Sequence, residues 1–318
     1  AKLEQIEAAR FCNMTAAALA SAETDLVTND KPVLIAANAV ENSTSAVWYT
    51  TATANITSTT DLAATDYPSN RAYDRWIHSV TKPNAAAATY YLGFDLSATA
   101  ASYDCAMIGG HNFAGLGITV TIEIADVNTF NTNLHTIATF TPSSTSKRLV
   151  TYDLHHTGSD PMRYTVDTST PDGRYARLKI VKATGTFVPE IGEFWLGRRR
   201  HLPAKFQSTL DDKRTVSKVS DFESRSGVST RYTFHRGQTQ RAGSAIIDGA
   251  ANISTVDSWW SECDQGTKPF LFCEHPSTDP QSTQLMHQLG GLEFSLVRAG
   301  ARELALEMRE VYPFTETE

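Results

Sequence analysis

IGEFWLGRRR, residues 191–200, runs from an apolar strand pattern at Phe194-Trp195-Leu196 straight into three arginines, Arg198, Arg199 and Arg200. The composition of the chain changes at this point. Before it the chain is rich in Thr, Ser and Ala, whereas residues 198–241 hold eleven Lys/Arg against four Asp/Glu. Such a change indicates two domains with different surroundings. We therefore predict an N-terminal segment over 1–29, a first domain over 30–197 and a second over 198–318, and expect proteases to cut first at Arg198–Arg200.

The overall composition excludes several classes of protein. With 318 residues, 41% of them apolar, the chain can bury a core without disulfides. The net charge of −7 argues against recognition of nucleic acid, which needs a basic surface. The lack of any long apolar run argues against membrane insertion. Cys12, Cys105, Cys263 and Cys273 form no CxxC pattern, so we expect reduced, buried thiols rather than a disulfide framework or a metal site.

Residues 30–197 carry the alternating pattern of β-strands. In 117–126, Ile118, Val120, Ile122 and Ile124 alternate with polar residues, which predicts a strand with one buried face. Residues 90–96 and 175–181 read in the same way, and turn-forming residues separate the strands. Many short strands with hardly any helix predict a sandwich or jelly roll. A short helix over 3–11 is the one helical pattern before this region.

After residue 197 the pattern predicts a small β domain with one helix. Apolar residues at helical spacing over 256–263, preceded by Ser254 and Thr255 as candidate N-caps, predict a helix from about Thr255 to Cys263. Short alternating segments at 231–236, 269–272, 292–296 and 304–309 predict strands, the last of which closes the domain. The expected fold class of the whole chain is therefore all-β, with this single helix in the second domain.

Motifs that carry chemistry are absent from the sequence. There is no HExxH, GxSxG or P-loop pattern. Gly115-Leu116-Gly117 lacks the third glycine of a dinucleotide loop and predicts a turn. His155 and His156 are adjacent, so on a strand they point to opposite faces and cannot bind one ion together. Asp211-Asp212, followed by two basic residues, reads as a solvated turn. We expect no enzymatic activity, no cofactor and no metal.

Aromatic residues raise a second type of function, because sugars stack on exposed rings. The candidate carbohydrate-binding residues are Trp76, His111 and Asn112. The competing interpretation, that Trp76 and Trp195 are core residues, is favoured because Trp is strongly buried on average. Trp259 and Trp260 are adjacent on the expected helix, so only one can face the core fully, and the other should contact a neighbouring element or subunit.

The first domain resembles a known family through several segments that follow one order. These are Tyr67-Pro68-Ser69-Asn70 with Arg75-Trp76, Tyr91-Leu92-Gly93-Phe94-Asp95-Leu96, Ile108-Gly109-Gly110-His111-Asn112, Ala176-Arg177-Leu178-Lys179-Ile180 and Ile191–Gly197. Together they resemble the galactose-binding-like (discoidin-type) jelly roll found in virion proteins of tailed bacteriophages. In that family the strand with Phe94-Asp95-Leu96, the turn with Gly110-His111-Asn112 and the closing strand at 192–197 belong to the framework, so the resemblance implies a fold more than a ligand.

The second domain, over about 203–311, resembles the tail-tube-like β domain of tube, distal tail and baseplate hub proteins of long-tailed phages. The resemblance rests on Pro203-Ala204-Lys205-Phe206, Ser226-Gly227, Tyr232-Thr233-Phe234, Trp259-Trp260, Lys268–Phe272 and Leu304–Val311. It implies a virion protein, assembled in the host cytoplasm as a ring of six subunits, or of three at a hub. The implied partners are further copies of the chain and the tube, tape-measure and hub proteins.

The charges of the second domain suggest how such a ring would form. Opposite charges at different places on one surface favour head-to-tail contacts. The candidate subunit-contact residues are Arg198, Arg199, Arg200, Lys213, Arg214, Lys218, Arg225, Glu303, Glu307 and Glu310. The expected function is thus a structural component of a phage tail tip, joining the tail tube to the hub and fibres. The alternative is a carbohydrate-binding module of a secreted or surface adhesin that binds a host glycan.

Overall fold

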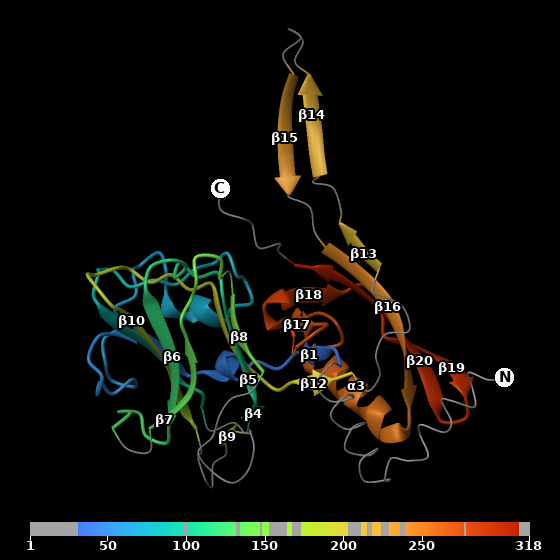
Figure 1. Ribbon diagram of the computed structural model, residues 1–318, viewed down its shortest axis with the longest axis horizontal. Coiled ribbons are helices and arrows are strands. Elements are labelled where there is room, and N and C mark those ends of the chain that lie inside the picture. Colours follow the sequence, from blue (N-terminus) through green and yellow to red (C-terminus); the bar gives the residue numbers. More distant parts are fainter. Residues whose placement is uncertain are drawn as a thin grey trace, which may run out of the picture.

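The computed structural model describes residues 31–97, 101–131, 134–146, 148–152, 164–166, 173–202, 211–214, 218–223, 229–235, 239–276 and 278–311. Within them the chain is mainly β, in antiparallel sheets with one α-helix, which confirms the expected fold class (Figure 1). The strands before residue 198 are β1 (Val33–Ile35), β2 (Ser45–Tyr49), β3 (Thr89–Asp95), β4 (Ala101–Tyr103), β5 (Cys105–Gly109), β6 (Ile118–Ala125), β7 (His135–Phe140), β8 (Arg148–Thr151), β9 (Tyr164–Val166), β10 (Tyr175–Lys182) and β11 (Glu193–Gly197). The later elements are β12 (Arg200–His201), β13 (Asp211–Arg214), β14 (Lys218–Glu223), β15 (Ser229–His235), β16 (Thr239–Asp248), α3 (Ala250–Glu262), β17 (Phe270–Cys273), β18 (Gln284–Gln288), β19 (Glu293–Arg298) and β20 (Ala301–Glu310). Short 3-10 helices are η1 (Ala39–Asn42), η2 (Ser69–Tyr73) and η3 (Pro280–Ser282).

Strands β2–β11 form a jelly-roll-like part built from two main sheets. One has five strands in the order β2-β3-β10-β6-β7, and the other has three in the order β11-β5-β8. The predicted strand at 117–126 is confirmed as β6, with Ile118, Val120, Ile122 and Ile124 buried between the sheets. On its other face Glu123 is also buried, because its carboxylate pairs with Arg177 of β10 at 2.6 Å.

The C-terminal part is an eight-stranded sheet, made of β1, β12, β13 and β16–β20, with α3 packed on one face. The sheet order is β12-β1-β17-β18-β20-β16-β13, with β19 on β20. Alternation in β20 is confirmed, since Leu304, Leu306 and Met308 are buried in a core shared with α3. In α3, Trp259 is buried against Phe270 of β17.

The position of β1 joins the two parts. This strand lies in the sequence of the predicted first domain, yet it pairs with β17 on one side and β12 on the other. Its Leu34 points into the core with α3, whereas Val33 and Ile35 point into a further core that contains Met107 and Trp195 of the jelly-roll-like part. The three-stranded sheet is therefore covered on both faces, which explains why every residue of β5 and β11 is buried.

Two predicted local structures are wrong, namely the start of the helix and the turn at Asp211-Asp212. The helix begins at Ala250, not near Thr255, because Gly249 adopts a positive φ of 86° and turns the chain sharply out of β16. The Thr255 hydroxyl instead donates to the Ala251 carbonyl at 3.1 Å, as in a helix interior. Asp211-Asp212 is not a turn but the start of β13, which pairs with β16. By contrast, the turn at Gly115-Leu116-Gly117 is confirmed.

Residues 198–200 form a short, hydrogen-bonded connection between two sheets. Gly197 ends β11, and Arg200 already belongs to β12, which pairs with β1. Between them the Arg199 backbone N–H donates to the Asp104 carboxylate at 2.8 Å. We therefore expect trypsin to leave 198–200 intact in the folded protein, contrary to what the composition alone suggested. Mass spectrometry of timed digests measures this, with urea-unfolded protein as the cleavable control. An early native fragment ending at any of these arginines would contradict the packing.

Strands β14 and β15 form an arm that projects from the body. They pair with each other in a two-stranded sheet, and Figure 1 shows this ribbon extending past β13 and β16, clear of the rest of the ribbon diagram. An isolated two-stranded ribbon is marginally stable in water. Two paired strands alone therefore give the arm little stability of their own.

Candidate functional site

The turn after η2 carries the most exposed tryptophan of the described residues. Trp76 is 56% exposed, whereas Trp195 is fully buried, so the core interpretation is right for Trp195 and wrong for Trp76. The Trp76 backbone N–H donates to the Asp74 carboxylate at 2.8 Å, which holds the turn. The neighbouring Ile77 is buried and anchors it.

Two glycines let this turn lie directly on the jelly-roll-like part. A Cβ atom at Gly110 or at Gly192 would overlap the Ile77 carbonyl oxygen. Gly110 also has a positive φ of 63°, which L side chains rarely adopt. The turn with Trp76 therefore sits beside the segment that holds His111 and Asn112, so the structure brings the three sequence-predicted carbohydrate residues to one region.

Trp76 and Asn112 are exposed and His111 is half-buried, and the side chains of His111 and Asn112 make contacts within the protein. The His111 ring stacks on Phe113 with centroids 4.9 Å apart, and burial lowers its pKa to about 4, so it is neutral at pH 7. The Asn112 side chain bridges the chain to the next loop, donating to the Val188 carbonyl at 3.0 Å and accepting from the Glu190 N–H at 2.9 Å. Both residues thus shape the surface beside Trp76 rather than present a cluster of polar groups.

Arg75, next to Trp76, joins the jelly-roll-like part to the C-terminal part. Its guanidinium donates to the Glu41 carboxylate, to the Ala36 carbonyl at 2.9 Å and to the Pro269 carbonyl just before β17. It also lies 4.8 Å above the ring of Trp195. These contacts fix a buried cation by hydrogen bonds on several sides, and the residue holds a positive φ of 61° to make them.

Glu193 of β11 is the buried acid behind this turn. Its carboxyl accepts from the Arg75 backbone N–H at 2.9 Å and lies 3.5 Å from the Asn38 amide. Burial, with smaller contributions from the charges of Asp74 and Glu41, raises the pKa of Glu193 well above its ordinary value. Sequence reasoning placed Glu193 and Arg75 in family segments but gave neither a role, because their partners are distant along the chain.

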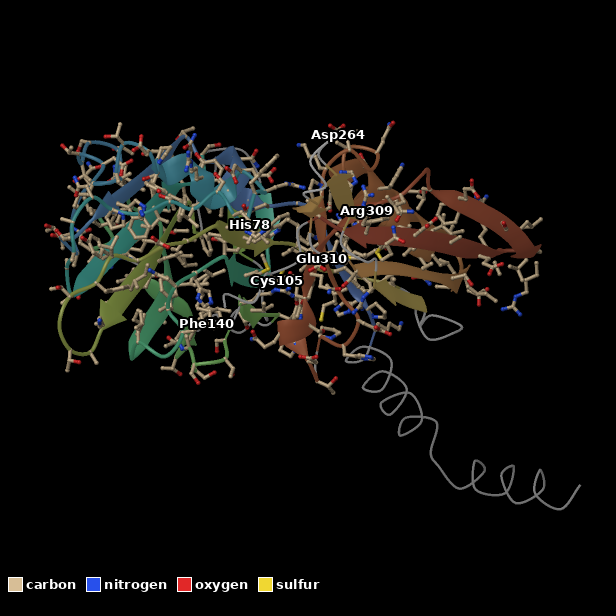
Figure 2. All side chains as sticks on the ribbon, turned by 90° about the horizontal axis from the view of Figure 1, so that it is seen from above. His78, Cys105, Phe140, Asp264, Arg309 and Glu310 are labelled. Atoms are coloured by element: carbon tan, nitrogen blue, oxygen red, sulfur yellow. The ribbon has the colours of Figure 1, made fainter. Side chains whose placement is uncertain are left out.

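Further contacts close the boundary between the two parts. The Tyr152 hydroxyl meets the Thr283 hydroxyl at 2.5 Å, and Arg148 lies 3.9 Å from Glu310. Cys105 and Cys273 lie in the same boundary core, and Figure 2 shows Cys105 and Glu310 near the place where the two parts meet. The expectation of reduced, buried thiols is confirmed for Cys105, Cys263 and Cys273, while Cys12 lies outside the described residues.

The residues predicted for subunit contacts fall into three groups. Glu310 is only 4% exposed and lies 3.9 Å from Arg148 of β8 within the same chain. Arg198, Arg199 and Arg200 are half-buried, Arg200 pairing with Glu262 of α3. Glu303 is half-buried and Glu307 exposed on β20. Lys213, Arg214 and Lys218 lie on β13 and β14, and Arg225 lies outside the described residues, as do His155 and His156.

A shallow hollow of about 500 Å³ lies on the face of the eight-stranded sheet opposite α3. Small residues form its floor, namely Ala242 and Ser244 of β16 and Ala305 of β20. Glu293 and Glu307 stand at its edge, and none of the described residues that line it is basic. The charged side chains that line the hollow are therefore both acidic.

The described part of the chain lacks two other kinds of site. Its His, Cys, Asp and Glu side chains nowhere form a group of three that could hold a metal ion. None of its helices is long and apolar enough to cross a membrane.

Comparisons with known proteins give limited information. No protein-family model and no curated protein matches the chain. A chitosan-binding module of a Paenibacillus sp. IK-5 chitosanase/glucanase is 14% identical with a TM-score of 0.31, over 50% of this chain and 98% of that one. A GH29 fucosidase of Ruminococcus gnavus is 12% identical with a TM-score of 0.31, and the match spans 51% of this chain but 26% of the fucosidase. Truncated AlyQ, with CBM32 and alginate lyase domains, is 9% identical with a TM-score of 0.30, over 88% of this chain and 91% of that one. Likeness at these TM-scores carries no argument about what this chain does.

Proposed function

We propose that the chain is a structural component of the tail tip of a long-tailed bacteriophage, a distal tail or baseplate ring protein that links the tail tube to the hub and fibres. The observation that carries the proposal is the projecting arm of β14 and β15 on a body whose two parts share one core. A body whose two parts are packed together can hold its binding partners in fixed relative positions, and a projecting ribbon can contact a neighbouring molecule. The resemblance of the sequence to virion jelly rolls and tube-like domains supplies the setting, a virion assembled in the host cytoplasm.

Native mass spectrometry of the purified chain and imaging of tails that carry a tagged copy test this proposal. We expect a closed ring, of six subunits or three, either in solution or at the tail tip. Contacts with the tube, tape-measure and hub proteins should appear when tails are cross-linked. A chain that stays monomeric at high concentration and is missing from purified tails would refute the proposal.

A second function, glycan binding, rests on Trp76. A tryptophan exposed to 56% on a turn held by Asp74 is a flat apolar surface of the kind on which sugar rings stack. On this proposal the chain would bind a host surface glycan, either as part of a tail or as a module of a surface adhesin. His111 is half-buried and the Asn112 amide bridges to Val188 and Glu190, so the proposal takes the ring of Trp76, which is 56% exposed, as the main contact.

Calorimetric titration with host polysaccharide tests the second function. We expect Trp76→Ala to weaken saturable binding about tenfold or more, since an aromatic anchor of this kind is worth roughly 1–3 kcal/mol. Trp76→Phe, which keeps a ring, should retain part of the affinity. Leu296→Ala serves as the control, because Leu296 is 78% exposed but lies on β19 of the C-terminal part. Equal affinity of the wild type and Trp76→Ala would remove Trp76 from any glycan site.

A further inference from the structure

A polar hollow of about 360 Å³ lies where the two parts of the molecule meet. It shares no lining residue with the hollow on the eight-stranded sheet. The loop before β8, the first residue of β8 and η3 supply its lining, which consists of Ser143, Thr145, Ser146, Arg148 and Gln281. Three hydroxyls, a guanidinium and a carboxamide therefore surround one space, and all of them except the carboxamide come from the jelly-roll-like part.

The three hydroxyls lie close together within one turn of the chain. The Ser143 Oγ atom lies 3.2 Å from the Thr145 Oγ1 atom and 3.1 Å from the Ser146 Oγ atom. The Ser143 backbone N–H donates to the Ser146 hydroxyl at 3.0 Å, which fixes the shape of the turn. A hydroxyl proton rotates to suit its partner, so this compact group can donate to an acceptor placed in the hollow.

Arg148 gives the hollow its charge. The residue is 8% exposed and lies 3.9 Å from the Glu310 carboxylate, a separation longer than that of a hydrogen bond. Burial lowers the pKa of Arg148 to about 10 although Glu310 acts in the opposite direction, so the guanidinium is still charged at pH 7. The cost of removing this cation from water thus exceeds what Glu310 returns, and a further negative charge beside it would be stabilised.

Acidic side chains are missing from the described residues that line this hollow. Along the chain, residues 127–152 hold two Lys/Arg and no Asp/Glu. The hollow on the eight-stranded sheet has the reverse character, because its charged lining residues are both acidic. A guanidinium with hydroxyl and amide donors around it favours an oxyanion, since hydrogen bonds to a charged acceptor are about twice as strong as those between neutral groups.

The arrangement of the donors favours a tetrahedral oxyanion over a carboxylate. The donors come from a loop, a strand and a 3-10 helix, and so approach the hollow from several sides. A phosphate or sulfate group presents acceptor oxygens in several directions, whereas a carboxylate presents two oxygens in one plane.

We propose that this hollow binds a phosphate or sulfate group, with Arg148 as the charged contact and Ser143, Ser146 and Gln281 as hydrogen-bond donors. Because Gln281 belongs to the C-terminal part, the bound group joins the two parts and stabilises their boundary. The site is independent of the ring proposal and of the surface at Trp76, so its failure would leave both of them standing.

Calorimetric titration of the full chain tests the site, with the ionic strength held constant by sodium chloride. We expect inorganic phosphate and sulfate each to bind saturably, one per chain, with a Kd in the millimolar range. Acetate should bind about tenfold more weakly, because it makes fewer hydrogen bonds to charged groups. Glycerol 3-phosphate distinguishes the source of the group. Tighter binding than that of inorganic phosphate supports a site for an esterified phosphate, and weaker binding supports a site for the free anion.

Variants at the edge of the hollow show where the anion binds. Gln281→Glu adds a carboxylate without changing the size of an exposed side chain, and should weaken phosphate binding about tenfold or more by repulsion. Gln265→Glu is the matched control, because Gln265 is also exposed but does not line the hollow, and it should bind phosphate like the wild type. The double variant Ser143→Ala/Ser146→Ala, which keeps the buried Arg148, should also lose affinity.

Circular dichroism checks that each variant is folded. The proposal is overturned if neither phosphate nor sulfate binds saturably to the wild type. It is also overturned if Gln281→Glu, folded like the wild type, binds phosphate with the same affinity as Gln265→Glu, because the anion then binds elsewhere. Acetate that binds as tightly as phosphate would contradict a tetrahedral ligand.

Discussion

Replacing Arg75 by methionine is expected to lower the free energy of unfolding by about 3–5 kcal/mol, the usual cost of breaking a buried, hydrogen-bonded ion pair from one side. Methionine keeps an apolar side chain at this position but removes the guanidinium that lies over Trp195, and it leaves Glu41 and the carbonyls of Ala36 and Pro269 without their donor. Because the Pro269 carbonyl belongs to the C-terminal part, the loss should weaken the boundary between the two parts in particular. Urea unfolding measures the change in stability.

Thiol labelling tells a boundary effect from a general loss of stability. Cys105 and Cys273 are buried in the boundary core, so both should react slowly in the wild type, and burial also raises the pKa of Cys105 well above its ordinary value. In a Cys12→Ser background, Arg75→Met should speed their labelling. Arg298→Ala is the control, since its pair with Asp248 is exposed and should contribute less than about 1 kcal/mol. Equal stability and equal labelling in Arg75→Met and Arg298→Ala would show that Arg75 does not hold the parts together.

Arg75→Lys examines whether charge alone is enough. Lysine keeps the positive charge but not the planar fork that reaches a carboxylate and two carbonyls at once. We expect this variant to recover only part of the lost stability. Full recovery would mean that the charge next to Glu41, rather than the hydrogen bonds to Ala36 and Pro269, accounts for the effect.

The sequence predicts the class of fold because strand periodicity is a local property. The alternation in 117–126 and 304–308 requires only one buried face, and both strands form as expected. Alternation of apolar and polar residues is less informative for β5 and β11, where every position is buried. An uninterrupted apolar strand is the sign of burial on both faces, and this sign was available in Cys105–Gly109. It implies a further layer, although not which segment supplies it.

The identity of that further layer lies beyond local reasoning. β1 is three residues long, and its partners in β17 are more than two hundred residues away along the chain. The same limit applies to Arg75, whose acceptor at Pro269 is 194 residues distant. The division into two domains at residue 197 remains a prediction. The point in the sequence at which one part gives way to the other does not coincide with the boundary between their hydrophobic cores. The same limit applies to the candidate site. The turn that carries Trp76 can lie against the jelly-roll-like part because Gly110 and Gly192, which are distant from it along the chain, have no Cβ atom.

Glu193→Gln is expected to change how stability depends on pH. Burial raises the folded pKa of Glu193 above its ordinary value of 4.5, so between the two pKa values the folded protein binds more protons at this site than the unfolded chain. Stability contributed by the protonated carboxyl is therefore fully present below the unfolded pKa and is lost as the pH rises toward the folded pKa. The slope should be about 1.4 kcal/mol per pH unit across that interval.

Glutamine removes this slope because it stays neutral and can still accept the Arg75 backbone N–H. The groups that face Glu193 act in both directions, with Asp74 and Glu41 raising its pKa and Arg75 lowering it, but burial has the largest effect. Urea unfolding at pH 5, 6, 7 and 8 should thus show Glu193→Gln gaining stability over the wild type as the pH rises. Taking the difference between the two proteins cancels other titrating groups, such as Glu310, whose pKa burial also raises. A constant difference between Glu193→Gln and the wild type at all four pH values would mean that Glu193 does not titrate above its ordinary range, and that the acid behind the Trp76 turn is ionised in the folded protein.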